Sequence, residues 1–348
     1  MRICIYIDSK GMGGIETHIL QLISGLLEST DYKIDLLFWQ DYSQQMDSNH
    51  PLIGKLQQLD SANNSTNYKR CRYLSAKGNL ATLHKYFLGN LSLVHTHGYK
   101  AGITARFMGL ITGTPVVSTY HNGDPGIGKL KLYNFMDKCT SFLSLNIAVN
   151  QMISKSLRKC KVISNFVNSM DKSCLHNELD TRKTIAFVGR LSYEKGPDLF
   201  AEITKELHHP ITVFGDGPMM ADLKNQYSHI EFKGMCDMDK YWQNIRVVIM
   251  PSRYEGLPLA ALEAMARGIP VIASNAGALP ELINKSKIGK TIALENLSFF
   301  QQEINQVMSQ NNSDYAIQGE KLIDFINENF SRRKTLPKII AHYKQAIG

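Results

Sequence analysis

The sequence has few cysteines and no long apolar segment, and both absences exclude classes of protein. Its six cysteines are spread over 348 residues without a single Cys-x-x-Cys spacing. We therefore expect reduced thiols in a cytoplasmic protein and no zinc site. No apolar run reaches the length of a membrane span, and the opening MRICIYIDSK indicates a strand followed by a glycine turn. We expect neither a signal peptide nor a membrane span.

The length and the charge distribution point to two domains of different character. A chain of 348 residues suits two domains of about 170 residues each. Residues 1–167 contain 18 Lys and Arg against 10 Asp and Glu, whereas residues 168–348 contain 21 of each kind, so the net charge of +8 comes from the first half. The basic residues stand among apolar ones at Lys69, Arg70, Arg72, Lys77, Lys129, Lys131, Lys155, Arg158, Lys159 and Lys161.

A basic surface of this kind predicts contact with anionic lipid or with an anionic lipid-linked molecule. A solvated basic face without a partner is the open alternative. No RNA-binding or helix-turn-helix motif accompanies the charge, so we expect no nucleic-acid partner.

The apolar pattern predicts an α/β fold with two doubly wound domains. Arg2 to Asp8 is an apolar run that ends at a glycine loop, and Ile15 to Leu27 has helical spacing. Five further buried strands are expected in the first domain: Ile34 to Trp39, Leu93 to Thr96, Pro115 to Tyr120, Leu145 to Val149 and Val162 to Asn165. Asp41 to Asn79 is polar and is expected to be an insert with one short helix.

The pattern restarts after a linker at Val167 to Lys183. Six strands are expected in the second domain: Thr184 to Gly189, Ile211 to Gly215, Ile230 to Lys233, Val247 to Met250, Val271 to Ala273 and Lys290 to Ala293. The predicted domains are therefore residues 1–167 and 168–330. Residues 331–348 form a last helix that Ser331 could cap and that Pro337 should kink or delay.

The segment from Pro251 to Ile283 contains the strongest chemical signal. A buried strand leads through a short loop into a helix expected at Leu259 to Arg267, with Pro258 suited to a first helical position. The free backbone N–H groups of Gly256, Leu257 and Leu259 would make a phosphate site at the start of this helix. Glu255 and Glu263 flank that site, and carboxylates beside a phosphate suit the hydroxyls of a nucleotide sugar.

The frame EGLPLAALEAMARGIPVIAS around these glutamates resembles the signature of family 4 retaining nucleotide-sugar glycosyltransferases, the group 1 glycosyl transferases of GT-B architecture. The alternative is a pair of surface glutamates on an amphipathic helix. The resemblance implies two Rossmann-like domains that face each other across a cleft, and a last helix that packs back on the first domain. It also implies a reaction that needs no metal and no cofactor, with the nucleotide sugar as a co-substrate.

The resemblance assigns a role to several residues outside that frame. Arg190 and Lys195, in GRLSYEKGPDLF, would clamp the donor pyrophosphate and neutralise the leaving diphosphate. Gly215 would line the nucleotide site, although a plain turn also explains it. The loop of Gly13 and Gly14 would face the donor phosphate, and His121 would touch the donor sugar.

The same resemblance divides the two glutamates between the two sugars of the donor. Glu255 would contact the hexose hydroxyls and Glu263 the ribose hydroxyls. His95 and His97 could line an acceptor pocket or only satisfy backbone groups. Asn165 is a weaker candidate, because Phe166 follows it where the family often has glycine.

Two competing patterns are weaker. A dinucleotide-binding fingerprint needs a third glycine where this chain has Glu16, although Asp35 falls near the position of a ribose-binding acid. Asp237 and Asp239 resemble a metal-binding pair, but we interpret them as acids at the start of a helix expected at Lys240 to Ile245.

We therefore predict a retaining hexosyltransferase that uses a nucleoside-diphosphate sugar, with a UDP-sugar favoured. The acceptor would be a hydroxyl of a lipid-linked, polysaccharide or lipopolysaccharide precursor, and the enzyme would be cytoplasmic or peripheral on the cytoplasmic face of the inner membrane. The alternatives are a nucleotide-sugar epimerase of the same architecture, an NAD-binding Rossmann enzyme, or a non-catalytic nucleotide-sugar binding protein.

Overall fold

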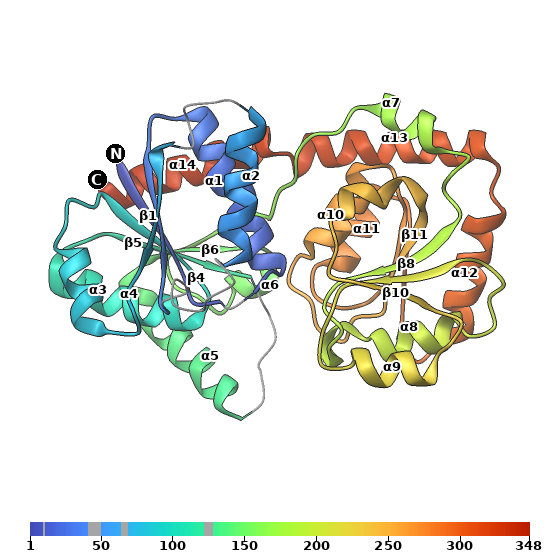
Figure 1. Cartoon of the computed structure of the whole chain (residues 1–348), viewed down its shortest axis with the longest axis horizontal. Helices are drawn as coiled ribbons and strands as arrows, with labels where there is room; N and C mark the ends of the chain where they lie inside the picture. The colour runs from blue at the N-terminus through green and yellow to red at the C-terminus, as the bar shows by residue number, and fades with distance from the viewer. Residues whose placement is uncertain (10, 41–49, 64–68, 122–127) are drawn as a thin grey trace. The chain divides into compact units, whose positions relative to one another are not determined.

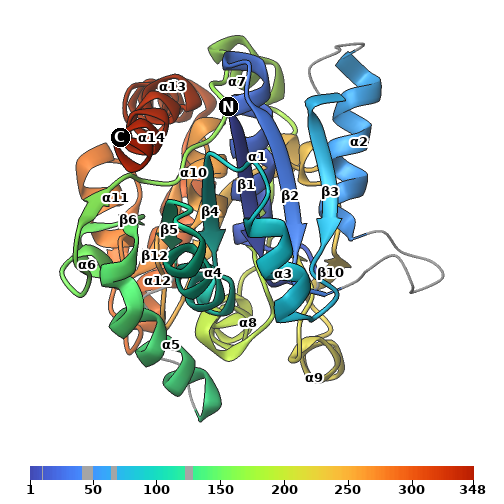
Figure 2. The ribbon, with the colours of Figure 1, turned by 90° about the vertical axis from the view of Figure 1, so that its left-hand side faces the viewer.

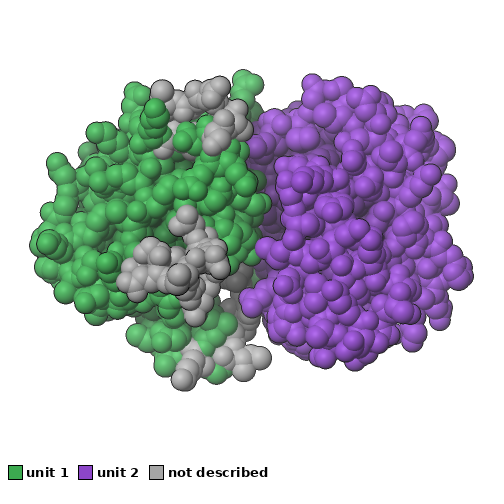
Figure 3. Space-filling model, in the orientation of Figure 1, with its two compact units in different colours: residues 1–165, 332–348 green, residues 166–331 purple. Residues whose placement is uncertain are grey.

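The computed structural model describes residues 1–9, 11–40, 50–63, 69–121 and 128–348 (Figure 1). These residues form two compact units, which Figure 3 colours separately. Unit 1 contains Met1–Asn165 together with Arg332–Gly348, and unit 2 contains Phe166–Ser331. The chain thus leaves unit 1, builds unit 2 and returns to unit 1 with its last helix. No helix of the described residues is long and apolar enough to cross a bilayer.

The described part of unit 1 is built on a seven-stranded parallel sheet with the order β3-β2-β1-β4-β5-β6-β7. Its strands are β1 (Arg2–Ile7), β2 (Lys33–Phe38), β3 (Cys71–Ser75), β4 (Leu93–His97), β5 (Val116–Tyr120), β6 (Leu145–Ala148) and β7 (Cys160–Val162). The central strands are buried along nearly their whole length. Near-continuous apolar runs are what a parallel sheet covered on both faces requires.

Helices cover both faces of this sheet. They are α1 (Gly14–Ser29), α2 (Pro51–Asn63), α3 (Leu80–Phe87), α4 (Tyr99–Thr112), α5 (Lys129–Thr140), α6 (Gln151–Ser154) and α14 (Arg332–Ile347), with a short 3-10 turn at Ser141–Leu143. Cys4 and Tyr6 point into a core under α3 and α4, which lie in front of the sheet in Figure 2. On the opposite face α1 packs against α14, and α14 lies on β4 and β5.

Unit 1 departs from the sequence predictions at three places. Residues 41–79 contain an edge strand, β3, in addition to the expected helix; residues 41–49 and 64–68 lie outside the described residues. β7 comes before the expected Val162 to Asn165 segment. Helix α14 begins directly after Ser331 and runs through Pro337, so the proline does not delay its start.

The described part of unit 2 has a six-stranded parallel sheet with the order β10-β9-β8-β11-β12-β13. Its strands are β8 (Thr184–Val188), β9 (Ile211–Phe214), β10 (Glu231–Gly234), β11 (Ile245–Met250), β12 (Val271–Ser274) and β13 (Lys290–Ile292). All six lie within one or two residues of the predicted segments. Together the two sheets confirm the predicted α/β class with two Rossmann-like domains.

Helices on both faces of this second sheet build two apolar layers. One face packs on α8 (Pro197–Thr204), α9 (Met220–Gln226) and α12 (Leu297–Ser309), and its core includes Phe187 and Phe200. The other face carries α7 (Lys172–Glu178), α10 (Leu259–Ala266), α11 (Leu279–Ser286) and α13 (Asn312–Asn329). Helix α7 lies in the stretch predicted to be a linker and packs against α13 through Leu175.

In each sheet, successive strands are added first toward one edge and then toward the other, and this change occurs at a defined point. In unit 1 the chain reverses between β1 and β4, and in unit 2 it reverses between β8 and β11. In open parallel sheets, ligands bind outside the carboxyl ends of the strands at such a switch point. The loops after these four strands are therefore where a site is expected in each unit.

Candidate functional site

In unit 2, the loops after β8 and β11 meet through an ion pair. Lys195 Nζ lies 2.7 Å from Glu255 Oε2, and the Glu255 side chain is 2% exposed. Ser252 Oγ donates to the other carboxylate oxygen, Oε1, at 2.8 Å. Two residues that the sequence analysis singled out, sixty positions apart, thus form an ion pair. The serine that holds the carboxylate of this pair was not singled out from the sequence.

Arg253 fixes the loop that carries Lys195. Its guanidinium donates to both carboxylate oxygens of Asp198, at 2.9 and 2.6 Å, and lies 4.1 Å from the centre of the Tyr193 ring. Its backbone N–H donates to the carbonyl of Glu194. Burial alone raises the pKa of Asp198, but the hydrogen bonds from Arg253 lower it overall. This two-pronged contact holds the β8 and β11 loops together.

The start of α10 is closely packed against the loop after β12. Gly277 has a φ of +56°, and a Cβ placed on it would lie 2.1 Å from the Glu255 carbonyl oxygen. The backbone N–H of Ala278 donates to the carbonyl of Gly256. Only glycine allows this approach, so Gly277 helps to set the position of Glu255.

The residues predicted to bind phosphate lie at the entry of α10, and the predicted start of that helix needs one correction. Gly256, Leu257, Pro258 and Leu259 are buried at the entry of α10, but Pro258 is the N-cap and not the first helical residue. Its φ of −71° and ψ of 125° are those of an extended cap. Glu263 is half-buried in the second turn, and its carbonyl accepts from Arg267 Nη1 at 3.1 Å.

Gly215 brings the end of β9 onto the loop that begins with Gly189. A Cβ on Gly215 would lie 1.9 Å from the Gly189 carbonyl oxygen, and two backbone hydrogen bonds join the same segments. Arg190 follows directly and is exposed. The close approach therefore anchors the backbone from which the Arg190 side chain extends into solvent.

In unit 1, a carboxylate occupies the start of α1. Gly13 is the N-cap, Gly14 begins the helix, and Glu16 is buried. Burial raises the pKa of Glu16, although hydrogen bonds from Ser9 and from the backbone of Glu16 and Gly13 oppose the rise. The loop predicted to face a phosphate thus already holds an acidic group.

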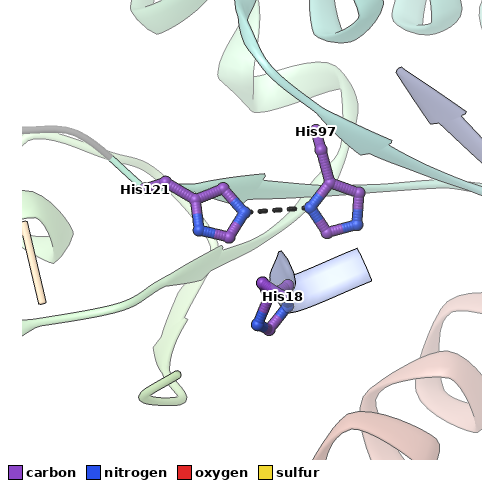
Figure 4. Close-up of side chains that lie close together, drawn as sticks. All are labelled: His18, His97 and His121. Carbon is purple, nitrogen blue, oxygen red and sulfur yellow. Dashed lines mark hydrogen bonds between the residues drawn. The ribbon is translucent and has the colours of Figure 1, made fainter. Parts of the chain in front are cut away.

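Four histidines gather at the carboxyl ends of β4 and β5. His97 Nδ1 lies 2.9 Å from His121 Nε2, as Figure 4 shows, and the side chain of Asn165 also hydrogen-bonds His121. His18, from α1, lies with its ring centre 4.9 Å from that of His121. Burial lowers the pKa of His121 to about 4 despite the opposing hydrogen bond from Asn165.

His95 has a structural role. One ring nitrogen is 2.6 Å from the Tyr343 hydroxyl of α14, and the other is 2.7 Å from Thr119 Oγ1. Of the two alternatives for His95, the structure favours satisfied hydrogen bonding, whereas His97 faces His121. His18 was missed, because a single histidine on a helix face gives no signal that it will meet residues some 80 and 100 positions later.

Asp35 is not arranged to bind a ribose. It is fully buried in β2, accepts from Arg72 at 2.8 Å on each oxygen, and accepts from Tyr86 at 2.6 Å. Asp239 likewise pairs with Arg267 at 2.6 Å, and short 3-10 turns replace the helix expected after it. The two residues behind the dinucleotide and metal alternatives therefore have structural partners.

Family models match both units. The model described as Glycosyltransferase Family 4 matches residues 12–169, and the model described as Glycosyl transferases group 1 matches residues 182–310. The chain belongs to the group 1 glycosyltransferases. Its predicted enzyme class and its GT-B fold, with two Rossmann-like domains, are thereby confirmed.

Several characterised and uncharacterised proteins are similar to this glycosyltransferase. An uncharacterized glycosyltransferase of Methanocaldococcus jannaschii is 26% identical over 93% of the chain and 88% of its own length. The UDP-Gal:alpha-D-GlcNAc-diphosphoundecaprenol alpha-1,3-galactosyltransferase of Escherichia coli is 28% identical over 68% of the chain and 73% of its own length.

Solved structures share the fold of this glycosyltransferase at low identity. Anabaena HepE in complex with UDP-glucose has a TM-score of 0.79 at 16% identity, covering 99% of this chain and 100% of that one. Sucrose-phosphate synthase of Thermosynechococcus elongatus has a TM-score of 0.77 at 16% identity, covering 99% of both chains.

Proposed function

We propose that this glycosyltransferase moves a hexose, with retention of anomeric configuration, from a UDP-sugar to a hydroxyl of a lipid-linked or polysaccharide precursor. The observation that carries the proposal is the buried Lys195–Glu255 pair beside the start of α10. A cation, the N-terminus of a helix and a carboxylate there offer partners for a diphosphate and for sugar hydroxyls.

Each unit 2 residue has a defined part in this proposal. Lys195 and the exposed Arg190 take the charge of the diphosphate as it leaves, which is stabilisation of charge that develops in the transition state. Glu255 accepts from hexose hydroxyls, and Glu263, one turn into α10, accepts from ribose hydroxyls. No metal is needed for the diphosphate, because the two cations neutralise it.

In unit 1, His121 is the proposed contact of the donor hexose. Its neutral imidazole, held by His97 and Asn165, can form a hydrogen bond with a sugar hydroxyl without adding a charge. For retention, the departing phosphate accepts the proton of the acceptor hydroxyl on the same face. Catalysis then depends on positioning and charge stabilisation rather than on a general base.

The names of similar proteins support a UDP donor and a lipid-linked or polysaccharide acceptor. The Escherichia coli relative is named for UDP-galactose and for a diphosphoundecaprenol acceptor, and another Escherichia coli relative for O-antigen biosynthesis. Anabaena HepE is described in complex with UDP and with UDP-glucose.

An exposed apolar and basic surface on unit 1 suits a lipid-linked acceptor. Helix α5, which extends away from the unit 1 sheet in Figure 1, packs against α4 and against the turn at Ser141–Leu143. Large apolar side chains on these elements are 38–67% exposed: Phe107, Leu110, Ile111, Leu132, Tyr133, Phe135, Met136 and Phe142. Exposed Lys131 and Lys138 accompany them on α5. Together they favour a peripheral contact with an anionic membrane.

Calorimetry with UDP, GDP and NAD tests the donor site directly. We expect UDP to bind the wild-type protein and Glu263→Ala to weaken binding by about 1–3 kcal/mol, because a charged hydrogen-bond acceptor is lost. Glu281→Ala, at an exposed position of helix α11, is the matched control and should bind UDP normally. Binding of NAD alone, unaffected by Glu263→Ala, would contradict the proposal.

Product analysis tests the reaction itself. UDP-hexose incubated with acceptor should give a glycoside of the same anomeric configuration as the donor, which NMR of the anomeric proton reports. An inverted product contradicts retention. A changed hexose formed from donor alone indicates the epimerase alternative instead.

A further inference from the structure

Three histidines from three separate elements converge in unit 1. His18 lies on α1, His97 ends β4, and His121 follows β5 (Figure 4). One ring nitrogen from each lies within 4.8 Å of the others. Within the described part of the chain, no other group of three or more His, Cys, Asp or Glu residues meets this condition. The cluster is therefore a distinct feature of unit 1 that the sequence did not reveal.

The rings of this cluster offer neutral nitrogen ligands. Burial lowers the pKa of His18, His97 and His121. A neutral imidazole presents one lone pair, which is the form that binds zinc and other divalent transition metals.

The spacing fits a metal ion once the rings of His97 and His121 turn. Two nitrogen ligands of a tetrahedral zinc ion stand about 3.3 Å apart, given Zn–N bonds of about 2.0–2.1 Å. The hydrogen-bonded nitrogens of His97 and His121 are 2.9 Å apart, and the widest separation in the cluster stays below 4.8 Å. Because His97 and His121 now point at each other, both rings must turn to share an ion.

The surroundings define which side chains belong to the site. His95 is adjacent to His97, but both its ring nitrogens are hydrogen-bonded, to Tyr343 and Thr119. His97 Nε2, in contrast, has no hydrogen-bond partner among the described residues, so this ring can change tautomer without breaking another bond. Asn165 holds His121 from outside the cluster, as hydrogen-bond partners of metal ligands commonly do.

We propose that His18, His97 and His121 together bind one divalent transition metal ion of the zinc class, with a fourth position left for water on the partly exposed side of His121. The ion is not a reactant in glycosyl transfer. Because the proposed function uses His121 at the donor sugar, a bound ion competes with that contact and inhibits transfer. This last consequence rests on the proposed function, whereas metal binding itself does not.

Titration of the full chain, free of any histidine tag, with ZnCl2 and CoCl2 tests the site. We expect one ion per chain, and an intense visible absorption band with Co2+ that indicates tetrahedral nitrogen coordination. His18→Gln and His97→Gln should each weaken zinc binding by at least about tenfold, which calorimetry measures. His208→Gln removes an exposed histidine of unit 2 and should leave binding unchanged.

Two outcomes overturn the inference. One is the absence of stoichiometric zinc or cobalt binding by the wild-type protein. The other is equal binding by wild type, His18→Gln and His97→Gln, each shown to be folded by its circular dichroism and thermal transition. Since the readout is metal binding, a failure here is separate from a failure to bind UDP or to transfer a hexose.

Discussion

Lys195 and Glu255 form an ion pair in which Nζ lies 2.7 Å from Oε2, and the carboxylate is almost completely shielded from water. Ser252 holds the second carboxylate oxygen, so the glutamate is positioned from two sides. The lysine side chain is 29% exposed. Lys195 therefore keeps N–H donors for an anionic ligand. Glu255 holds the Lys195 ammonium group in place.

Lys195→Ala should weaken UDP binding by about 1.5–3 kcal/mol, the usual worth of hydrogen bonds to charged groups, which is roughly tenfold to a hundredfold in Kd. Calorimetry with UDP measures the change. The matched control is Lys285→Ala, because Lys285 also pairs with a glutamate, Glu281, at 2.6 Å but is exposed on α11. Equal effects of the two substitutions would remove Lys195 from the donor site.

Gly277→Ala should destabilise unit 2 and displace Glu255. The new Cβ would lie 2.1 Å from the backbone oxygen of Glu255, and backbone cannot rotate away as a side chain can. Gly234→Ala is the control, since Gly234 has a similar φ of +68° but no atom within 4 Å of its added Cβ. Gly234→Ala carries only the left-handed strain, about 1–2 kcal/mol.

Denaturant unfolding should therefore show a further loss of about 1–3 kcal/mol for Gly277→Ala, from overpacking against the backbone. Equal losses for the two glycines would mean that the loop relaxes freely and that Gly277 does not position Glu255.

The inner strands of unit 2, β8, β9, β11 and β12, were predictable from sequence because each is a short, mainly apolar run that is buried along most of its length. The edge strand β3 was not, since its residues are half-exposed and Arg72 gives it a charged position. The Arg72 side chain donates to Asp35, which lies opposite it on the neighbouring strand β2. A partner 37 positions away leaves no periodic signal.

The residues of the candidate site also include some that the sequence made identifiable and others that it did not. Motif residues such as Glu255 and Lys195 were identifiable within their sequence frames, but the residues that hold them were not. Arg253 and Asp198 became partners only through the meeting of two loops. His18 joins His97 and His121 only because the fold brings this part of α1 beside the ends of β4 and β5.

Asp35→Asn should destabilise unit 1 in a pH-dependent way. Burial alone raises the pKa of Asp35, but Arg72, Tyr86 and Arg2 lower it overall from 3.8. The stability from the ionised carboxylate is therefore present above the unfolded pKa and is lost as pH falls through the folded pKa. We expect a loss of about 1–3 kcal/mol at neutral pH, and a smaller difference from wild type as the pH falls below 3.8.

Denaturant unfolding at several pH values measures this difference, with the transitions fitted separately because two units need not unfold together. Asp31→Asn is the control, since Asp31 is fully exposed and only 3.9 Å from Arg70. It should have no measurable effect. A pH-independent loss for Asp35→Asn would show that the carboxylate is not ionised in the folded protein.

The apolar and basic surface of α4 and α5 leads to a prediction about membranes. Wild-type protein should bind vesicles that contain phosphatidylglycerol, and binding should weaken as salt rises, because lysines contribute through screened charge. Leu132→Ser combined with Phe135→Ser removes two side chains that are 59% and 65% exposed on α5. Fully burying one such side chain is worth about 1.5–3 kcal/mol, so the double variant should bind at least about tenfold more weakly in vesicle co-sedimentation.

Met235→Ser with Ile317→Ser, which removes comparably exposed side chains of unit 2, should bind as wild type does. Wild-type protein that ignores anionic vesicles, or an equal loss in both double variants, would show that this surface is solvated and that the acceptor is met without a membrane contact.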